Sequence, residues 1–231
     1  MSKATPTRRP ARPGAAPGRK PTPASGAKPS SSKRLPIALI AGAALAAGLI
    51  AVIVVSMGSG GDETLEVGTP AITGDSLPEF ATVENDTAVG MTIPEVTGAD
   101  FAGTPVSITR DGRAKVIMFF AHWCGVCQQE VPLIMGWLPG ADLPDGVDLV
   151  SVSTGVNPNQ ANYPPSAWLE REGWTVPVIL DDAAYNVADA FGLSAYPYFI
   201  FVDAEGKVVV RLTGGLPTAT IESIINEMAG A

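Results

Sequence analysis

Cysteine, histidine and charge are all scarce in this sequence of 231 residues. Its two cysteines are too few for a disulfide-stapled scaffold or a four-cysteine zinc site. Its single histidine excludes a multi-histidine metal centre. Charged residues make up 16% of the chain, whereas about 25% is usual for a soluble domain. What remains to carry chemistry is one pair of thiols.

The few charges are divided unevenly along the chain. Residues 1–34 hold nine of the 15 Lys and Arg and no Asp or Glu. Residues 58–231 hold the other six bases and all 23 acids, a net charge of −17. A body this acidic argues against nucleic-acid binding, which needs clustered cations to displace the counterions of phosphate.

Composition divides the chain into four parts. Residues 1–34 are rich in Pro, Ala, Gly, Ser and basic residues and predict a disordered tail. Residues 35–57 are apolar, and residues 58–75 have the composition of a flexible stalk. Residues 76–231 are long enough for one domain.

The apolar run at 35–57 predicts a transmembrane helix. It has 23 consecutive residues without a charge, and a helix of about 20 residues spans the hydrocarbon core of a bilayer. A cleavable signal peptide has a shorter apolar stretch of about 7–15 residues, so we expect an uncleaved anchor. The bases before the run place the N-terminus in the cytoplasm. We therefore expect a single-pass protein of the cell membrane whose C-terminal domain is extracytoplasmic.

Strand and helix patterns alternate through the C-terminal part. The continuous apolar run at 116–121 is typical of a central strand that is covered on both faces. An alternation of strands and helices, followed by a terminal hairpin and helix, predicts an α/β sandwich with a mixed sheet. We expect strands at 104–108, 116–121, 147–152, 176–180, 198–202 and 207–212, and helices at 125–137, 166–172, 184–191 and from about 217.

The two cysteines lie where this architecture places chemistry. Cys124 follows the central strand and opens the next helix, and Cys127 lies one turn further on. The free amide donors and the positive dipole end of a helix stabilise a thiolate, the form of sulfur that attacks a disulfide. Cys127 is near enough to close a small ring and release a mixed disulfide. We predict that Cys124 attacks and Cys127 resolves.

Three other interpretations of the thiols remain open. A structural disulfide would close a loop of only four residues and stabilise the fold by about 2 kcal/mol. A metal site would need His122 beside the thiols, and strand alternation makes that orientation doubtful. Inert free thiols are disfavoured outside the membrane, where no cytosolic reductant acts. Redox exchange is the preferred interpretation, and it requires neither a metal nor any other cofactor.

The segment from Phe119 to Cys127, followed by Glu130 and Pro132, resembles the thioredoxin fold. More narrowly, it is similar to the membrane-anchored thiol–disulfide oxidoreductases of the TlpA/ResA type. The resemblance runs from about 90 to 228 and includes the segments 173–181 and 192–207. It implies a three-layer α/β/α sandwich with a mixed central sheet and a helix–strand insertion near 173–178.

The resemblance also assigns roles to individual residues. Pro197 matches the family's cis-proline beside the cysteines, which leaves the backbone of Tyr196 free to pair with a substrate strand; the alternative is an ordinary loop proline. Glu130 matches an acidic residue that tunes thiol pKa values and moves protons; the alternative is a solvated helix glutamate. Trp123 is expected to shield the site and contact substrate, and Pro132 to kink the helix.

Two positions depart from the family pattern. Val126 stands where many relatives have a proline beside the second cysteine, so their reduction potential does not carry over to this chain. His122 occupies a variable position, and we expect its side chain to be solvated.

The resemblance implies reduction of disulfides in exported proteins, with apocytochrome c as one substrate class. It implies electrons from an integral membrane thiol transporter of the DsbD/CcdA kind. An oxidase that forms disulfides in secreted proteins would use the same chemistry at a higher potential. A copper-binding module would hold Cu(I) through the two thiolates, but the extra residue between the cysteines and the distant histidine of Sco-type proteins are missing here.

Overall fold

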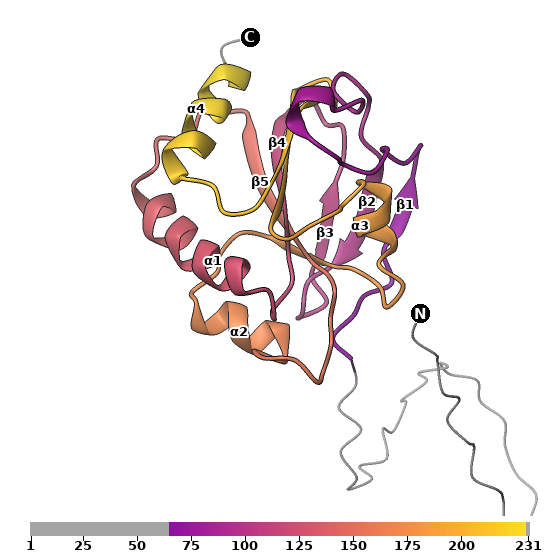
Figure 1. The fold of residues 1–231 in the computed structure, drawn as a ribbon, viewed down its shortest axis with the longest axis vertical. Helices are drawn as coiled ribbons and strands as arrows, with labels where there is room; N and C mark the ends of the chain where they lie inside the picture. Colours follow the sequence, from indigo (N-terminus) through magenta and orange to yellow (C-terminus); the bar gives the residue numbers. More distant parts are fainter. Residues whose placement is uncertain (1–64, 230–231) are drawn as a thin grey trace, which may run out of the picture. The chain divides into compact units, whose positions relative to one another are not determined.

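A five-stranded mixed sheet forms the centre of the part of the chain that the computed structural model describes, residues 65–229 (Figure 1). The strands lie in the order β6-β5-β4-β7-β8. β5 is parallel to both β4 and β6, whereas β7 is antiparallel to β4 and β8. The mixed sheet predicted from the sequence is confirmed. The strands are β4 (Ala114–Phe120), β5 (Val147–Ser153), β6 (Val178–Leu180), β7 (Tyr198–Val202) and β8 (Val208–Thr213).

The central strand β4 is buried along its whole length. Its side chains alternate between two cores, with Val116, Met118 and Phe120 on one face. Ile117 and Phe119 lie on the other face. Because both faces are covered, the strand is a continuous apolar run rather than an alternation with polar residues.

Helices cover one face of the sheet and a mixed layer covers the other (Figure 1). The first layer holds α1 (Gly125–Trp137), α2 (Pro165–Arg171) and α4 (Thr218–Ala229). α2 and β6 lie on either side of residues 172–177, close to the place where the helix–strand insertion is expected, and β6 is the edge strand of the sheet. Two short 3₁₀ helices lie at Val83–Asn85 and Leu138–Gly140.

The second layer differs from the predicted layer of helices. It contains α3 (Asn186–Ala190) together with a three-stranded antiparallel sheet in the order β1-β2-β3. Of these strands, β3 (Pro105–Ile108) was expected, whereas β1 (Ala71–Thr73) and β2 (Glu95–Ala99) were not. Both are short and lack an apolar alternation, so only their pairing identifies them as strands.

Part of the predicted stalk belongs to this domain. Residues 71–73 pair with β2, and the amide of Gly68 donates to the carbonyl of Asp181 at 2.8 Å. The Ser166 hydroxyl donates to the Glu66 carboxylate at 2.6 Å. The expected boundary at 76 is therefore too late by about ten residues.

The predicted tail, the apolar run at 35–57 and the beginning of the stalk lie outside the described residues. Within residues 65–229, every helix is too short or too polar to cross a bilayer.

Candidate active site

The junction between β4 and α1 brings Cys124 to the start of a helix. β4 ends at Phe120, and Cys124 is the N-cap of α1 with extended backbone angles. Its sulfur accepts a hydrogen bond from the backbone N–H of Cys127 at 3.2 Å. A cysteine sulfur thus takes the place of the usual capping oxygen. The backbone N–H that donates to it is one of the free amide donors that stabilise negative charge at the start of a helix.

The two thiols differ in their access to solvent. Both are free, and Cys124 is 8% exposed whereas Cys127 is fully buried. Burial raises the pKa of the Cys127 thiol, and its hydrogen bond to Cys124 raises it further. At neutral pH Cys127 therefore keeps its proton while the Cys124 sulfur accepts hydrogen bonds, which is the asymmetry that an attacking and a resolving thiol require.

The cis geometry expected of Pro197 is confirmed. The Tyr196–Pro197 peptide bond is cis, and Pro197 directly precedes β7. A second cis bond, Tyr163–Pro164, lies at the start of α2 and was not foreseen.

An open groove of about 510 Å³ lies at Cys124, and Cys127 does not line it. The sequence assigned Trp123, Cys124 and Tyr196 to the site, and the structure brings all three together here. The sequence did not assign Gly125, Val126 and Gln129 to the groove, although they also line it.

Gly155, which follows β5, holds the aromatic wall of the groove in place. The indole N–H of Trp123 donates to the carbonyl of Gly155 at 2.6 Å. Gly155 has a φ of +65°, and a Cβ there would lie 2.9 Å from the hydroxyl oxygen of Tyr196. Only glycine fits both constraints. Its place at the carboxyl end of a parallel strand was the available sequence signal, since ligand sites gather at that edge of a sheet.

A buried polar chain supports Tyr196 from behind. Its hydroxyl is hydrogen-bonded to Thr154, and the Thr154 hydroxyl donates to the Asp181 carboxylate at 2.7 Å. Asp181 also accepts the amides of Val187 and Ala188. Burial raises the pKa of Tyr196 to about 12, so this side chain is a neutral phenol at physiological pH.

His122 is buried, which contradicts the expected solvated side chain. It is 1% exposed; its Nδ1 lies 2.7 Å from the carbonyl oxygen of Ala161, and its Nε2 accepts the amide of Asn157. These partners fix a neutral ring with the proton on Nδ1. Burial lowers the pKa of His122, outweighing the opposing effects of the Ala161 carbonyl and of Glu66. Through Asn157 and Ala161, His122 holds the loop 154–163 beside the site.

Glu130 is also buried, at 3% exposure, so the alternative of a solvated helix glutamate is wrong. Its carboxylate accepts the amide of Leu216 at 3.0 Å and lies against Gly215. Burial raises the pKa of Glu130, and the amide of Leu216 opposes part of that shift. The residue stands three positions after Cys127 on α1, one turn along the same helix, with Pro132 also inside that continuous helix.

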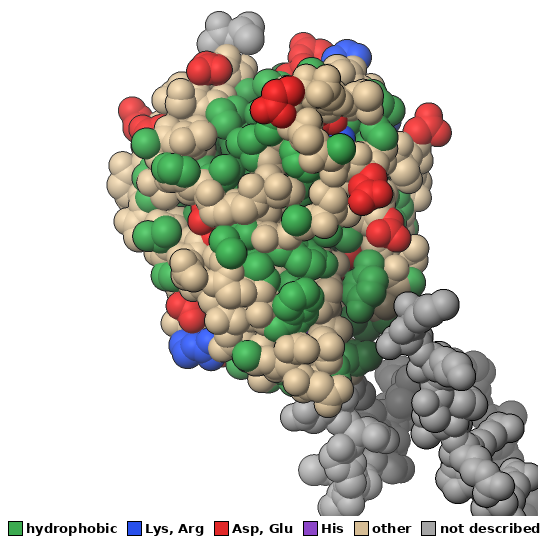
Figure 2. Space-filling view, in the orientation of Figure 1, with side chains coloured by type: hydrophobic (Ala, Val, Ile, Leu, Met, Phe, Trp, Pro, Cys, Tyr) green, Lys and Arg blue, Asp and Glu red, His purple; other side chains and the backbone are tan. Residues whose placement is uncertain are grey.

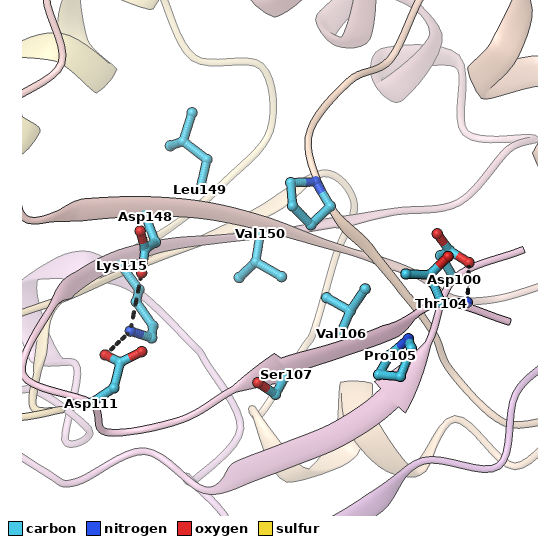
Figure 3. Close-up of a pocket in the computed structure, with 11 residues that line it drawn as sticks. Asp100, Thr104, Pro105, Val106, Ser107, Asp111, Lys115, Asp148, Leu149 and Val150 are labelled. Atoms are coloured by element: carbon cyan, nitrogen blue, oxygen red, sulfur yellow. Dashed lines mark hydrogen bonds and ion pairs between the residues drawn. The ribbon is translucent and has the colours of Figure 1, made fainter. Parts of the chain in front are cut away.

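A second cavity of about 450 Å³ lies away from the cysteines, near the beginning of β4 (Figure 3). Lys115 lies at one end, 2.5 Å from an oxygen of Asp111 and 3.6 Å from one of Asp148. At the other end Asp100 accepts the amide of Thr104. The charged groups there form ion pairs or accept backbone amide hydrogen bonds within the protein, and no thiol lines the cavity. Among the described residues, no cluster of three His, Cys, Asp or Glu is placed to hold a metal ion.

Comparison with known proteins agrees with this geometry. The family model described as Redoxin matches residues 88–227. The thiol-disulfide oxidoreductase ResA of Geobacillus thermodenitrificans is 29% identical over 146 residues, which cover 63% of this chain and 79% of the relative. The thiol:disulfide interchange protein HelX of Rhodobacter capsulatus is 26% identical over 134 residues, 58% of this chain and 70% of the relative.

A solved structure is similar as well. A solution structure from Bacteroides thetaiotaomicron, described as a candidate protein disulfide isomerase, aligns with a TM-score of 0.51 and 25% identity. The alignment covers 68% of this chain and 95% of the Bacteroides protein.

Replacing His122 by Gln should remove part of the pH dependence of stability. Because burial lowers the pKa of His122 in the folded state, the unfolded chain binds a proton first, near pH 6.5, and wild-type stability falls as the pH drops below that value. We expect His122→Gln to lower the free energy of unfolding by about 1–3 kcal/mol at pH 8, and by less at pH 5. Urea unfolding of both proteins at the two pH values measures the difference. An equal cost at both would contradict the assignment.

Replacing Glu130 by Gln should change the reactivity of the thiols. Above its own pKa, the Glu130 carboxylate opposes a second negative charge nearby, so its removal should raise the rate of alkylation in that pH range by about fivefold, from about 1 kcal/mol of Coulomb energy. The raised pKa of Glu130 should also place an inflection above pH 4.5 in the wild-type profile of rate against pH, absent from the variant. Iodoacetamide labelling checks both. Glu170→Gln, at an exposed position on α2, is the control and should leave the profile unchanged.

Proposed function

The chain belongs to the Redoxin family, and from this membership and the site geometry we propose that Cys124 and Cys127 exchange a dithiol for a disulfide in client proteins outside the cytoplasm. This activity is that of a thioredoxin-like thiol–disulfide oxidoreductase of the ResA type. The observation that carries the proposal is the Cys124 sulfur at the N-cap of α1, opening onto a groove with a buried thiol behind it.

In the reducing direction, the Cys124 thiolate attacks one sulfur of a client disulfide. The Cys124–client disulfide forms, the client S–S bond breaks, and the released client thiolate takes up a proton. Cys127 then loses its proton and attacks the Cys124 sulfur, which releases the second client thiol and leaves the Cys124–Cys127 disulfide. Two electrons have passed to the client.

The surrounding residues serve these two steps. Trp123, Tyr196 and Pro197 contact the client beside its disulfide, as in the family that the motif resembles. Cys127 must lose a proton from a thiol whose pKa is raised by burial. We assign the acceptance of that proton to Glu130, whose raised pKa allows it to exchange protons closer to neutrality than an ordinary glutamate does.

We further propose that residues 35–57 anchor the chain in the cell membrane with the N-terminus in the cytoplasm. The length of this apolar run and the nine bases before it support that orientation. The domain would then receive electrons from a membrane thiol transporter of the DsbD/CcdA kind and reduce exported proteins such as apocytochrome c.

Single substitutions of the two cysteines test the division of labour. Cys124→Ala should abolish reduction of a protein disulfide, because the attacking sulfur is lost. Cys127→Ala should instead accumulate a mixed disulfide between Cys124 and the client, visible by non-reducing electrophoresis and mass spectrometry. Undiminished activity in both variants would refute the mechanism.

The reduction potential tests the direction of electron flow. Equilibration of the purified protein with glutathione should give a value well below about −180 mV, as a reductase requires. A value above that level would assign the chain to disulfide formation, with the same two cysteines and the same chemistry.

A further inference from the structure

The groove at Cys124 has walls without charge. Trp123, Val126 and Tyr196 contribute carbon surface, Gly125 contributes backbone, and Gln129 contributes a neutral amide. The exposed fractions of Trp123 and Val126 are 38% and 42%, so large apolar side chains are open to solvent beside the reactive sulfur.

The polar atoms of the two aromatic side chains are already engaged. The Trp123 indole N–H donates to Gly155, and the Tyr196 hydroxyl is bonded to Thr154. The two rings meet edge to face with their centroids 5.7 Å apart. The two aromatic side chains therefore present only ring carbon to a ligand. Among the residues that line the groove, Gln129 alone has a side-chain amide.

The segments around the groove carry no charge either. Four of them meet there: 121–129, 154–163, 192–197 and 213–220. Gly155 contacts Trp123 and Tyr196, and Gly215 approaches Val126. Together these 33 residues contain no Asp, Glu, Lys or Arg, whereas the 16% average of the chain would give about five. In Figure 2 the surface beside the N-terminal end of α1 is mostly green and tan; some red atoms show over the middle of α1, and other red and blue atoms lie over α2 and α3.

This neutral face contrasts with the rest of the domain. Residues 58–231 carry a net charge of −17, whereas the six residues that line the groove carry no charged side chain. Apart from the Cys124 sulfur and the buried Glu130 carboxylate behind Gly215, the groove offers no charge to a charged client side chain that loses its water there. An apolar client side chain would bury carbon against Trp123 and Val126.

We propose that the groove selects client segments in which the disulfide cysteine is flanked by uncharged, apolar residues. The inference rests on the proposed function and specifies its substrate class. The occupant is an extended client segment whose neighbouring apolar side chain lies between Trp123, Val126 and Tyr196. Contact chemistry at the groove decides which client reacts, not long-range attraction of basic clients to the acidic domain.

A series of peptide disulfides tests this selection. The peptides share one leaving thiol and differ only in the two residues beside the cysteine, which are Leu, Gln, Lys or Glu. Each reacts with the reduced full-length chain in a non-ionic detergent, and each rate is divided by the rate with dithiothreitol to remove intrinsic reactivity. The Leu peptide should react at least tenfold faster than the Lys and Glu peptides at both 50 and 300 mM salt. Equal rates, or a Lys peptide that is fastest at low salt, would overturn the inference.

Substitutions of the exposed Gln129 test where the selection arises. Gln129→Glu should raise the ratio of the Lys to the Leu rate by threefold or more, and Gln129→Lys should raise the ratio of the Glu to the Leu rate equally. Ratios cancel any general effect on Cys124. Glu205→Gln changes the net charge by the same amount at the opposite end of β7, and its ratios should stay at the wild-type values. If neither Gln129 substitution changes these rate ratios, the selection arises elsewhere and the proposal is contradicted.

A small neutral disulfide distinguishes a failure of client selection from a failure of the proposed function. Bis(2-hydroxyethyl) disulfide has no flanking residues, so it reports on thiol exchange alone. If the protein reduces it while all peptides react alike, the selection fails and the proposed function stands. If Cys124 fails to reduce it, the proposed function itself is wrong.

Discussion

The hydrogen bond from the Cys127 amide to the Cys124 sulfur is the contact on which the site depends. This hydrogen bond forms because α1 begins a few residues beyond the carboxyl end of β4. That junction gives one sulfur the donors of a helix start and buries the other one turn later. The unequal access of two thiols with the same covalent chemistry is thus a consequence of where the strand stops.

Buried polar residues then hold the loops around the sulfur. His122 fixes the loop at 154–163 through Asn157 and Ala161, and Asp181 fixes Tyr196 through Thr154. These groups are costly to bury, and each has its hydrogen-bond partners. Because the polar contacts point inward, the groove keeps an apolar and uncharged surface toward a client.

Most of the fold follows from local sequence. The continuous apolar run of β4 and the helical spacing of apolar residues between Gly125 and Trp137 are local signals, and the structure has both elements. β1 and β2 could not be found this way, because their residues have no apolar alternation and they acquire strand geometry by pairing across about 20 intervening residues. For the same reason, residues 65–75 have the composition of a stalk and yet belong to the domain.

The sequence by itself determined the chemistry: two cysteines separated by two residues at the start of a helix, a proline before a late strand, and an acidic body. Spacing along one element is a local property, so these features needed no partner from elsewhere in the chain. Tertiary structure alone decided that His122 and Glu130 are buried and that Gly155 meets both Trp123 and Tyr196. Those facts depend on loops more than 30 residues apart that meet at one edge of the sheet, and no local pattern encodes which of them will touch.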